Sequence, residues 1–271
     1  MAALLIGAKA LVVLYGVIVT VLFLSQRRML FRPDRTPPDL ARAGVPELRQ
    51  ITITTADGLS LLAWYLPPVP EGNHVVLYLH GNAGHIGHRG YRLGPFRRLG
   101  WGVLLLEYRG YGGNPGRPSE AGLLADARAG LAALRAMGFA PSSIFLWGES
   151  LGSGLAVQLA VEQPVAAVFL EAPYTSITAI ARERFQFVPV GWLLLDRFDS
   201  LRVIGGVRAP VLVMHGTRDR VIPVAMGRAI YAAAPDPKEL WIAPHAGHLD
   251  LIEAGAMSVA ADFVGRMEPA T

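Results

Sequence analysis

Two hydrophobic patterns divide this chain into an amino-terminal segment and a larger remainder. From residue 2 to residue 24 nearly every position is apolar, and Lys9 is the only charge before Arg27 and Arg28. Beyond residue 49, short apolar runs alternate with longer amphipathic segments. The chain therefore predicts one long apolar helix followed by a domain of alternating strands and helices.

The amino-terminal apolar segment is long enough to cross a membrane. A helix over residues 2–24 would be about 34 Å long, against a hydrocarbon layer of roughly 30 Å. The alternative is a cleaved signal peptide, but Ser-Gln-Arg-Arg follows in place of a small-x-small site. A buried core helix would have to hide every face. We predict an uncleaved anchor over residues 1–26, a basic, Pro-rich joint over 27–48, and one domain over 49–271.

Basic residues bear on the orientation of this anchor. The arginines after the apolar segment outnumber Lys9 before it. By the positive-inside rule this places the main domain in the cytoplasm, although the amino terminus and Lys9 pull the other way. We also expect this Arg cluster to attract anionic lipid headgroups.

The periodicity after the joint predicts a parallel sheet. Two runs form a hairpin around Asp57-Gly58. Further strands are expected at 75–79, 103–106, 144–147, 167–170, 211–214 and 240–242. Helices are expected near 86–99, 119–137, 150–162, 224–234 and 249–267. Continuously apolar strands separated by amphipathic helices indicate an α/β fold with a mostly parallel sheet covered on both faces.

Polar and glycine-rich segments follow these strands, at the edge where active sites gather in such sheets. One of them, "GESLG", has Gly148-x-Ser150-x-Gly152 between a strand and a helix. This is the pattern of a nucleophile elbow, in which a sharp turn exposes the serine and a β-carbon at either glycine would collide with neighbouring backbone. Ser150 is the candidate nucleophile.

A serine nucleophile needs a base, and the base needs an orienting acid. Asp219 and His248 follow Ser150 in the order Ser, acid, His, each just beyond a strand end. Other candidates are Asp196, Asp199 and Asp250 for the acid, which we expect to cap or form ion pairs, and His245 for the base. The backbone N–H groups of Leu151 and Asn82 are the expected oxyanion donors.

The composition and motifs argue against several other kinds of site. The chain has no cysteine, which excludes disulfides and thiolate ligands. His80, His85 and His88 could be imagined beside His248 as metal ligands, but no carboxylate or spacing rule supports this. The net charge of +4 comes without a dense basic stripe or a nucleic-acid motif. We predict no metal, no cofactor and no nucleic-acid partner.

Taken together, "LHGNAGHIGHR", "YRGYGGNPGRPSEAGLLADA", "GESLG", "PVLVMHGTRDRVIP" and "HAGHLDL" resemble the α/β-hydrolase superfamily. The resemblance covers about residues 26 to 265. More specifically, the motifs resemble the membrane-anchored α/β-hydrolase-domain group of serine hydrolases, whose eukaryotic relatives include protein depalmitoylases. It implies Ser150, Asp219 and His248 as a triad, with the Asn82 and Leu151 amides as oxyanion hole. Leu249 departs from the Asn that many relatives have at this position.

The segment between the predicted strands at 167–170 and 211–214 is expected to form a small cap, about residues 175–207. It is rich in large apolar side chains, and we assign Phe185, Phe187 and Trp192 to substrate binding, although simple packing is an alternative. The prediction is a membrane-anchored serine hydrolase that cleaves lipid-like acyl esters or thioesters through an acyl-enzyme on Ser150. An amidase or serine aminopeptidase, or a non-catalytic tethered scaffold, are the alternatives.

Overall fold

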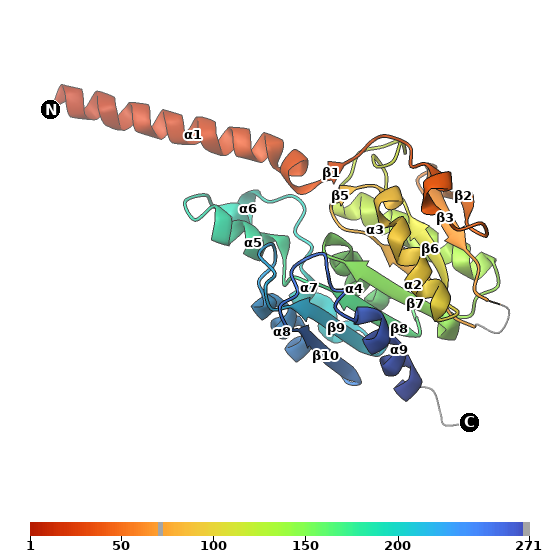
Figure 1. The fold of residues 1–271 in the computed structure, drawn as a ribbon. Helices are drawn as coiled ribbons and strands as arrows, with labels where there is room; N and C mark the ends of the chain where they lie inside the picture. Colours follow the sequence, from red (N-terminus) through yellow and green to blue (C-terminus); the bar gives the residue numbers. More distant parts are fainter. Residues whose placement is uncertain (70–72, 268–271) are drawn as a thin grey trace.

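A twisted eight-stranded sheet forms the centre of the molecule (Figure 1). The computed structural model describes residues 1–69 and 73–267. The strand order is β10-β9-β8-β7-β4-β6-β3-β2, parallel throughout except at β3 and β2, which form the predicted hairpin. The strands are β2 (Arg49–Thr54), β3 (Ser60–Leu66), β4 (Val75–Leu79), β6 (Gly102–Leu106), β7 (Ile144–Glu149), β8 (Ala167–Glu171), β9 (Val211–Gly216) and β10 (Lys238–Ala243).

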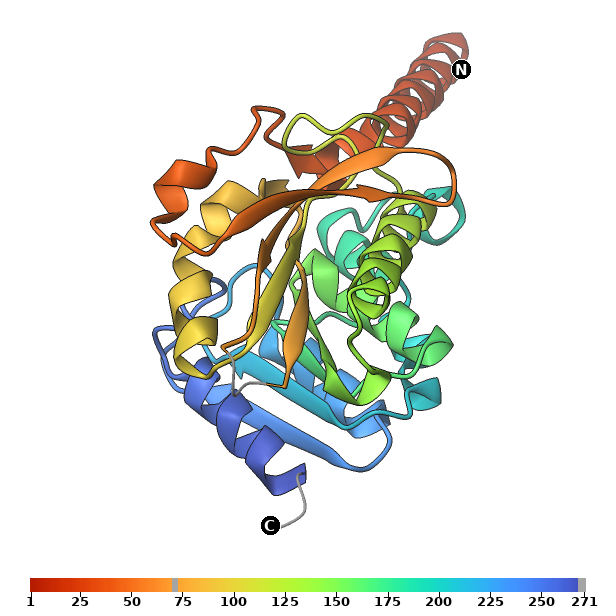
Figure 2. The same ribbon diagram turned by 90° about the vertical axis from the view of Figure 1, so that its right-hand side faces the viewer.

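Helices cover both faces of this sheet, as the continuously apolar strands predicted. Alternate strand residues point to opposite faces and build two separate cores. One core packs under α3 (Glu120–Ala136), α4 (Leu151–Glu162) and α8 (Val224–Ala233). The other packs under α2 (Leu93–Arg98) and α9 (Ala256–Met267). Figure 2 shows α2 and α9 on one side of the sheet and α3 and α4 on the other. The predicted fold class is confirmed.

Two predicted helices differ from the observed ones. The helix expected at 86–99 begins as a 3-10 helix, η2 (Ile86–Arg92), before α2. The helix expected from residue 249 begins only at α9, because Gly255 adopts a φ of +112° and interrupts the helical path. Shorter 3-10 turns complete the fold: η1 (Leu40–Ala43), η3 (Pro141–Ser143) and η4 (Ile204–Gly206).

The amino-terminal helix α1 (Ala2–Leu30) continues past the predicted boundary at residue 26 and projects from the domain (Figure 1). It is long and apolar enough to cross a membrane. The chain after it is no free linker, since Phe31 is only 2% exposed and packs edge-on against Phe198. A short parallel pair, β1 (Arg32–Pro33) with β5 (Ala83–Gly84), then ties this joint to the loop after β4.

The cap segment, residues 175–207, connects β8 to β9 and holds three short helices: α5 (Ile177–Arg184), α6 (Val190–Leu193) and α7 (Ser200–Val203). Ser176 caps α5 by accepting the N–H of Ala179. In Figure 1, α5 and α6 lie beneath the end of α1 nearest the domain. The cap segment therefore stands between the apolar helix and the carboxyl edge of the sheet.

Candidate active site

Ser150 occupies the sharp turn between β7 and α4. Its backbone has φ +50° and ψ −115°, a conformation that non-glycine residues rarely adopt. The turn is possible because the flanking glycines have no side chain: a β-carbon at Gly152 would overlap the carbonyl oxygen of Leu79, and one at Gly148 would lie 2.5 Å from the Cα of Ser153. The Ser150 amide donates to the Glu171 carbonyl at 2.9 Å, which anchors the turn to β8.

A chain of hydrogen bonds joins three residues that are far apart in the sequence. Nε2 of His248 lies 3.0 Å from Oγ of Ser150, and Nδ1 of the same ring lies 2.7 Å from Oδ2 of Asp219. Asp219 follows β9, and His248 lies in the loop after β10. Because these strands are parallel to β7, both residues lie at the same carboxyl edge of the sheet as Ser150. This is the geometry needed for a base that takes a proton from a serine.

Asp219 is held in one orientation by its own loop. Its Oδ1 accepts the N–H groups of Val221 and Ile222, both at 2.8 Å. Buried His215, one strand position before Gly216, places its Nε2 3.3 Å from Oδ2. Burial opposes ionisation of Asp219, but hydrogen bonds from His215, His248 and the Ile222 amide outweigh it and hold its pKa below the usual range.

The rival residues have other partners. Asp196 pairs with Arg27 and accepts the N–H of Glu120, while Asp199 pairs with Arg202. Oδ1 of Asp250 accepts the N–H of Gly247. His245 is exposed, and its backbone N–H donates to Thr217. These carboxylates therefore cap and form ion pairs, as their sequence positions suggested.

The two residues predicted to supply oxyanion donors, Asn82 and Leu151, line the same cavity as Ser150. Leu151 begins α4, so its amide lies at a helix end where N–H groups point outward. Asn82 is fixed from three directions: its side chain donates to the Leu30 carbonyl at 2.8 Å, and its carbonyl accepts from the Arg32 amide and the Tyr111 hydroxyl, each at 2.9 Å.

A buried ionic network lies behind the nucleophile turn, and sequence reasoning missed most of it. Glu149 contacts Arg89 at 2.8 Å, Arg92 at 3.4 Å and the Tyr78 hydroxyl. Arg92 also forms two hydrogen bonds with Glu171. Burial disfavours the Glu149 carboxylate, but the two guanidinium groups outweigh this and lower its pKa. The signal in the sequence is the i, i+3 spacing of Arg89 and Arg92, which puts both on one face of a helical turn.

Ser150 lines an apolar cavity of about 320 Å³, a volume within the range typical of small-molecule sites. The cap segment supplies one wall, and α1 supplies another. The cap residues that line it are Ile177, Ile180, Ala181, Arg184, Phe185, Val188, Val190, Leu193 and Leu194. Those from α1 are Val19, Leu22, Phe23, Gln26, Met29 and Leu30. The contribution of α1 was not predicted, because no local pattern reveals which helix packs over a distant strand end.

The three aromatic residues assigned to substrate binding lie in different places. Phe185 lines the cavity. Phe187 and Trp192 are outside its wall, with 88% and 90% of their surfaces exposed. The cavity lining therefore supports the assignment of Phe185 to substrate binding and does not support that of Phe187 and Trp192.

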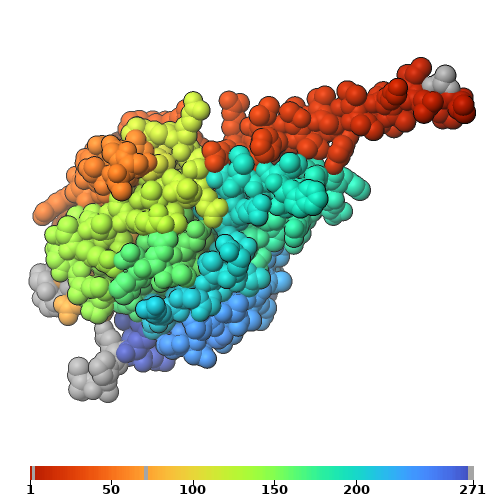
Figure 3. Space-filling view, turned by 180° about the vertical axis from the view of Figure 1, so that it is seen from behind, coloured from red at the N-terminus to blue at the C-terminus, as the bar shows by residue number. Residues whose placement is uncertain are grey.

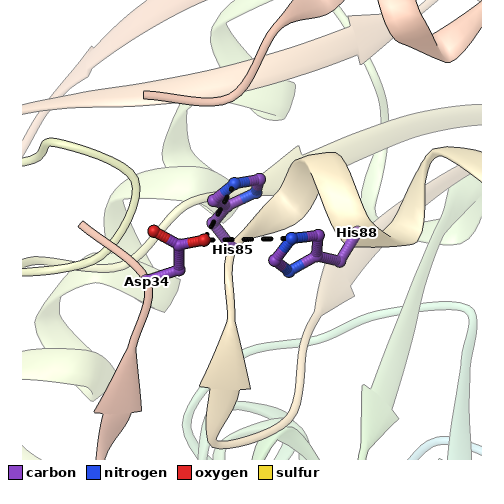
Figure 4. Close-up of side chains that lie close together, drawn as sticks. All are labelled: Asp34, His85 and His88. Atoms are coloured by element: carbon purple, nitrogen blue, oxygen red, sulfur yellow. Dashed lines mark ion pairs between the residues drawn. The ribbon is translucent and has the colours of Figure 1, made fainter. Parts of the chain in front are cut away.

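Among residues 1–69 and 73–267, one group of side chains could hold a metal ion: Asp34, His85 and His88 (Figure 4). Nε2 of His85 lies 3.6 Å, and Nε2 of His88 3.9 Å, from Oδ2 of Asp34. However, Nδ1 of His85 accepts the N–H of Gly87, which places the ring proton on the nitrogen that faces Asp34. A metal-binding histidine normally donates its second ring N–H instead. The cluster fits polar contacts of neutral imidazole rings with Asp34, between the joint and the loop after β4.

The family model described as serine aminopeptidase, S33, matches residues 70–205. An uncharacterized protein of Mycobacterium tuberculosis is 40% identical over 235 residues, covering 86% of this chain and 84% of its own. The lysophosphatidylserine lipase ABHD12 of Danio rerio is 32% identical over 197 residues, which cover 65% of this chain and 51% of the lipase.

Solved structures share the fold at low sequence identity. An esterase of Pyrococcus furiosus, PF2001, superposes with a TM-score of 0.69 at 20% identity, covering 88% of this chain and 97% of the esterase. A puromycin-hydrolyzing peptidase of Mycobacterium tuberculosis superposes with a TM-score of 0.68 at 20% identity, covering 84% of this chain and 40% of the peptidase. The central domain thus has the α/β-hydrolase fold.

Proposed function

Since this chain belongs to the serine aminopeptidase, S33, family of α/β-hydrolases, we propose that it is a membrane-anchored serine hydrolase that cleaves carboxylic esters or thioesters of lipid-like acyl groups. One observation carries the proposal: the hydrogen-bonded chain from Asp219 through His248 to Ser150 opens into an apolar cavity. The chemistry is that of acyl transfer, and the cavity walls suit an acyl chain.

In the proposed reaction, His248 Nε2 takes the proton of the Ser150 hydroxyl as Oγ attacks the acyl carbonyl carbon. The amides of Asn82 and Leu151 stabilise the negative charge on the carbonyl oxygen. The tetrahedral intermediate collapses, the bond to the alcohol or thiol breaks, and His248 returns its proton to that leaving group. A water molecule, activated by the same ring, then hydrolyses the acyl-enzyme. Asp219 keeps the His248 proton on Nδ1 throughout.

Charge in the cavity favours an acyl ester over an aminoacyl amide. An aminopeptidase needs an acidic group to bind the substrate amine, but no carboxylate lies among the described residues that line the cavity. Its charged lining residues are Arg32 and Arg184. The family description and the puromycin-hydrolyzing structural relative keep an amidase as the second candidate.

Contacts made by α1 before residue 24 support a retained anchor over a cleaved leader. The Tyr15 hydroxyl donates to the Phe187 carbonyl at 2.8 Å, and Val19, Leu22 and Phe23 line the cavity. Cleavage after residue 24 would also remove part of the cavity wall. A cytoplasmic position of the domain remains the prediction from the basic residues after the helix.

A panel of aryl esters, acyl thioesters and aminoacyl amides, run on the wild type beside Ser150→Ala, tests the proposed function. We expect ester or thioester turnover in the wild type and a loss of about three or more orders of magnitude in the variant. A fluorophosphonate probe should label the wild type and the exposed-serine control Ser258→Ala, but not Ser150→Ala. Preferred turnover of aminoacyl amides would favour the amidase, and unlabelled wild type would indicate a non-catalytic protein.

A further inference from the structure

The half of α1 nearest the domain belongs to the candidate site as well as to the anchor. Val19, Leu22 and Phe23 lie in the apolar segment that is expected to enter the membrane, and they line the cavity that also contains Ser150. These three residues lie between Lys9 and the next strongly polar positions, Gln26 and Arg27. One wall of the cavity is therefore built from side chains of the membrane helix itself.

The cap segment follows α1 over a considerable length. The Tyr15 hydroxyl donates to the Phe187 carbonyl at 2.8 Å, the Gln26 side chain bonds Leu195 at 2.8 Å, and Arg27 pairs with Asp196. From Tyr15 to Arg27 the helix rises about 18 Å at 1.5 Å per residue. Figure 3 shows this part of α1 resting on the cap segment, with the other end projecting beyond it. The tip of the cap segment, around Phe187 and Trp192, thus lies beside the predicted membrane-spanning part of α1.

The side chains at this tip have the chemistry of a membrane interface. Phe187, whose carbonyl accepts from Tyr15, is 88% exposed, and Trp192 in the following helix α6 is 90% exposed. Exposed Arg182 and Arg184 lie in the last turn of α5, a few residues before Phe187. Tryptophan is enriched where one end of a side chain meets hydrocarbon and the other meets water, and arginines attract anionic headgroups.

We propose that the tip of the cap segment, with Phe187 and Trp192, inserts into the bilayer beside α1, and that the cavity between α1 and the cap receives its acyl chain directly from the lipid phase. The tip is expected to contact the bilayer in which α1 is embedded, since Phe187 lies against Tyr15 of that helix and both Phe187 and Trp192 are exposed. The substrate would then be a lipid ester or thioester residing in that same membrane. This last step rests on the proposed hydrolase function, whereas insertion of the tip does not.

Trp192 allows insertion to be measured without any substrate. Full-length protein is placed in phosphatidylcholine–phosphatidylglycerol nanodiscs with or without lipids brominated on the acyl chain, which quench tryptophan by contact. We expect brominated lipid to quench the wild type, Trp192→Phe to remove most of that quenching, and Trp241→Phe, in edge strand β10, to retain it. Quenching that is equal in Trp192→Phe and the wild type would overturn the proposal.

Activity tests the route of the acyl chain. For Phe187→Ser/Trp192→Ser we expect turnover of a long-chain ester dispersed in the nanodisc to fall about tenfold, because two membrane-embedding rings are lost. Turnover of a water-soluble short-chain ester should stay within about twofold, since neither ring lines the cavity. An equal fall for both esters, or none for either, would contradict entry from the bilayer. Failure of fluorophosphonate to label Ser150 would instead refute the proposed function, while the quenching result would still decide insertion.

Discussion

Replacing Asp219 with asparagine should move the ring proton of His248 from Nδ1 to Nε2. Oδ1 of Asp219 accepts two backbone N–H groups at 2.8 Å, so the carbonyl oxygen of an asparagine must take that position. The new NH₂ group then faces Nδ1 of His248, which lies 2.7 Å from Oδ2 in the wild type. Nδ1 would have to accept, the ring proton would move to Nε2, and Nε2 could no longer take the proton of Ser150.

A tautomer reversal of this kind in a Ser-His-Asp triad lowers turnover about 10⁴-fold, equivalent to about 5 kcal/mol in the activation free energy. The assay is kcat/KM on a water-soluble short-chain ester, together with the rate of fluorophosphonate labelling. Thermal unfolding of the variant checks that the fold persists. The matched control is Asp250→Asn, because the asparagine oxygen can still accept the N–H of Gly247 and activity should be nearly unchanged.

Retention of more than about a tenth of wild-type activity in Asp219→Asn would refute this reasoning. It would mean that the His248 ring does not depend on Asp219 for its proton placement, in spite of the short hydrogen bond between them. A large loss in Asp250→Asn would point to the other carboxylate of this loop.

Three further predictions concern stability and can be measured by chemical denaturation. Gly152→Ala forces a β-carbon onto main-chain atoms and should lower the free energy of unfolding by at least about 1–3 kcal/mol, whereas Gly265→Ala, with open space in α9, should leave it unchanged or slightly higher. Arg92→Met leaves the buried Glu171 carboxylate without its ion pair and Glu149 with Arg89 as its one remaining cation, and should cost about 3–5 kcal/mol. Arg128→Met, in a surface pair, should cost no more than about 1 kcal/mol. Folding lowers the pKa of Glu149, so the contribution of its carboxylate to stability is complete above the unfolded pKa of about 4.5 and declines as the pH falls below that value. The free energy of unfolding should therefore fall less steeply with decreasing pH in Glu149→Gln than in the wild type. Equal pH dependence in the two proteins would contradict the pairing.

The fold was predictable because its strongest signals are local. Each buried parallel strand is a continuous apolar run, and β4 was predicted at residues 75–79 with the bounds that the structure has. The turn at Ser150 was also readable, because only glycine at positions 148 and 152 avoids overlap with backbone. The helix start at Ala256 was not, since the backbone conformation of Gly255 depends on how the preceding turn packs.

The features that were missed depend on contacts between distant parts of the chain. His215 lies beneath Asp219 because the turn after β9 folds back on the strand, and nothing in "VLVMHGTRD" distinguishes it from an ordinary buried histidine. The apolar character of the cap segment indicated a hydrophobic wall, yet it could not separate Phe185, which faces the cavity, from Phe187 and Trp192, which do not. Their direction follows from how the cap packs against α1.

The chain passes from α1 into the domain core without a flexible linker, and this limits where the proposed enzyme can work. Leu30 ends the helix, Phe31 is already in the core, and Arg27 is paired with the cap segment. In the proposed membrane-anchored enzyme, Ser150 would thus be held at a set height relative to the bilayer, unlike a nucleophile carried on a flexible tether. An enzyme anchored in this way would act in cis, on molecules of the membrane that holds it, and a neighbouring vesicle or a distant soluble carrier would stay beyond its reach.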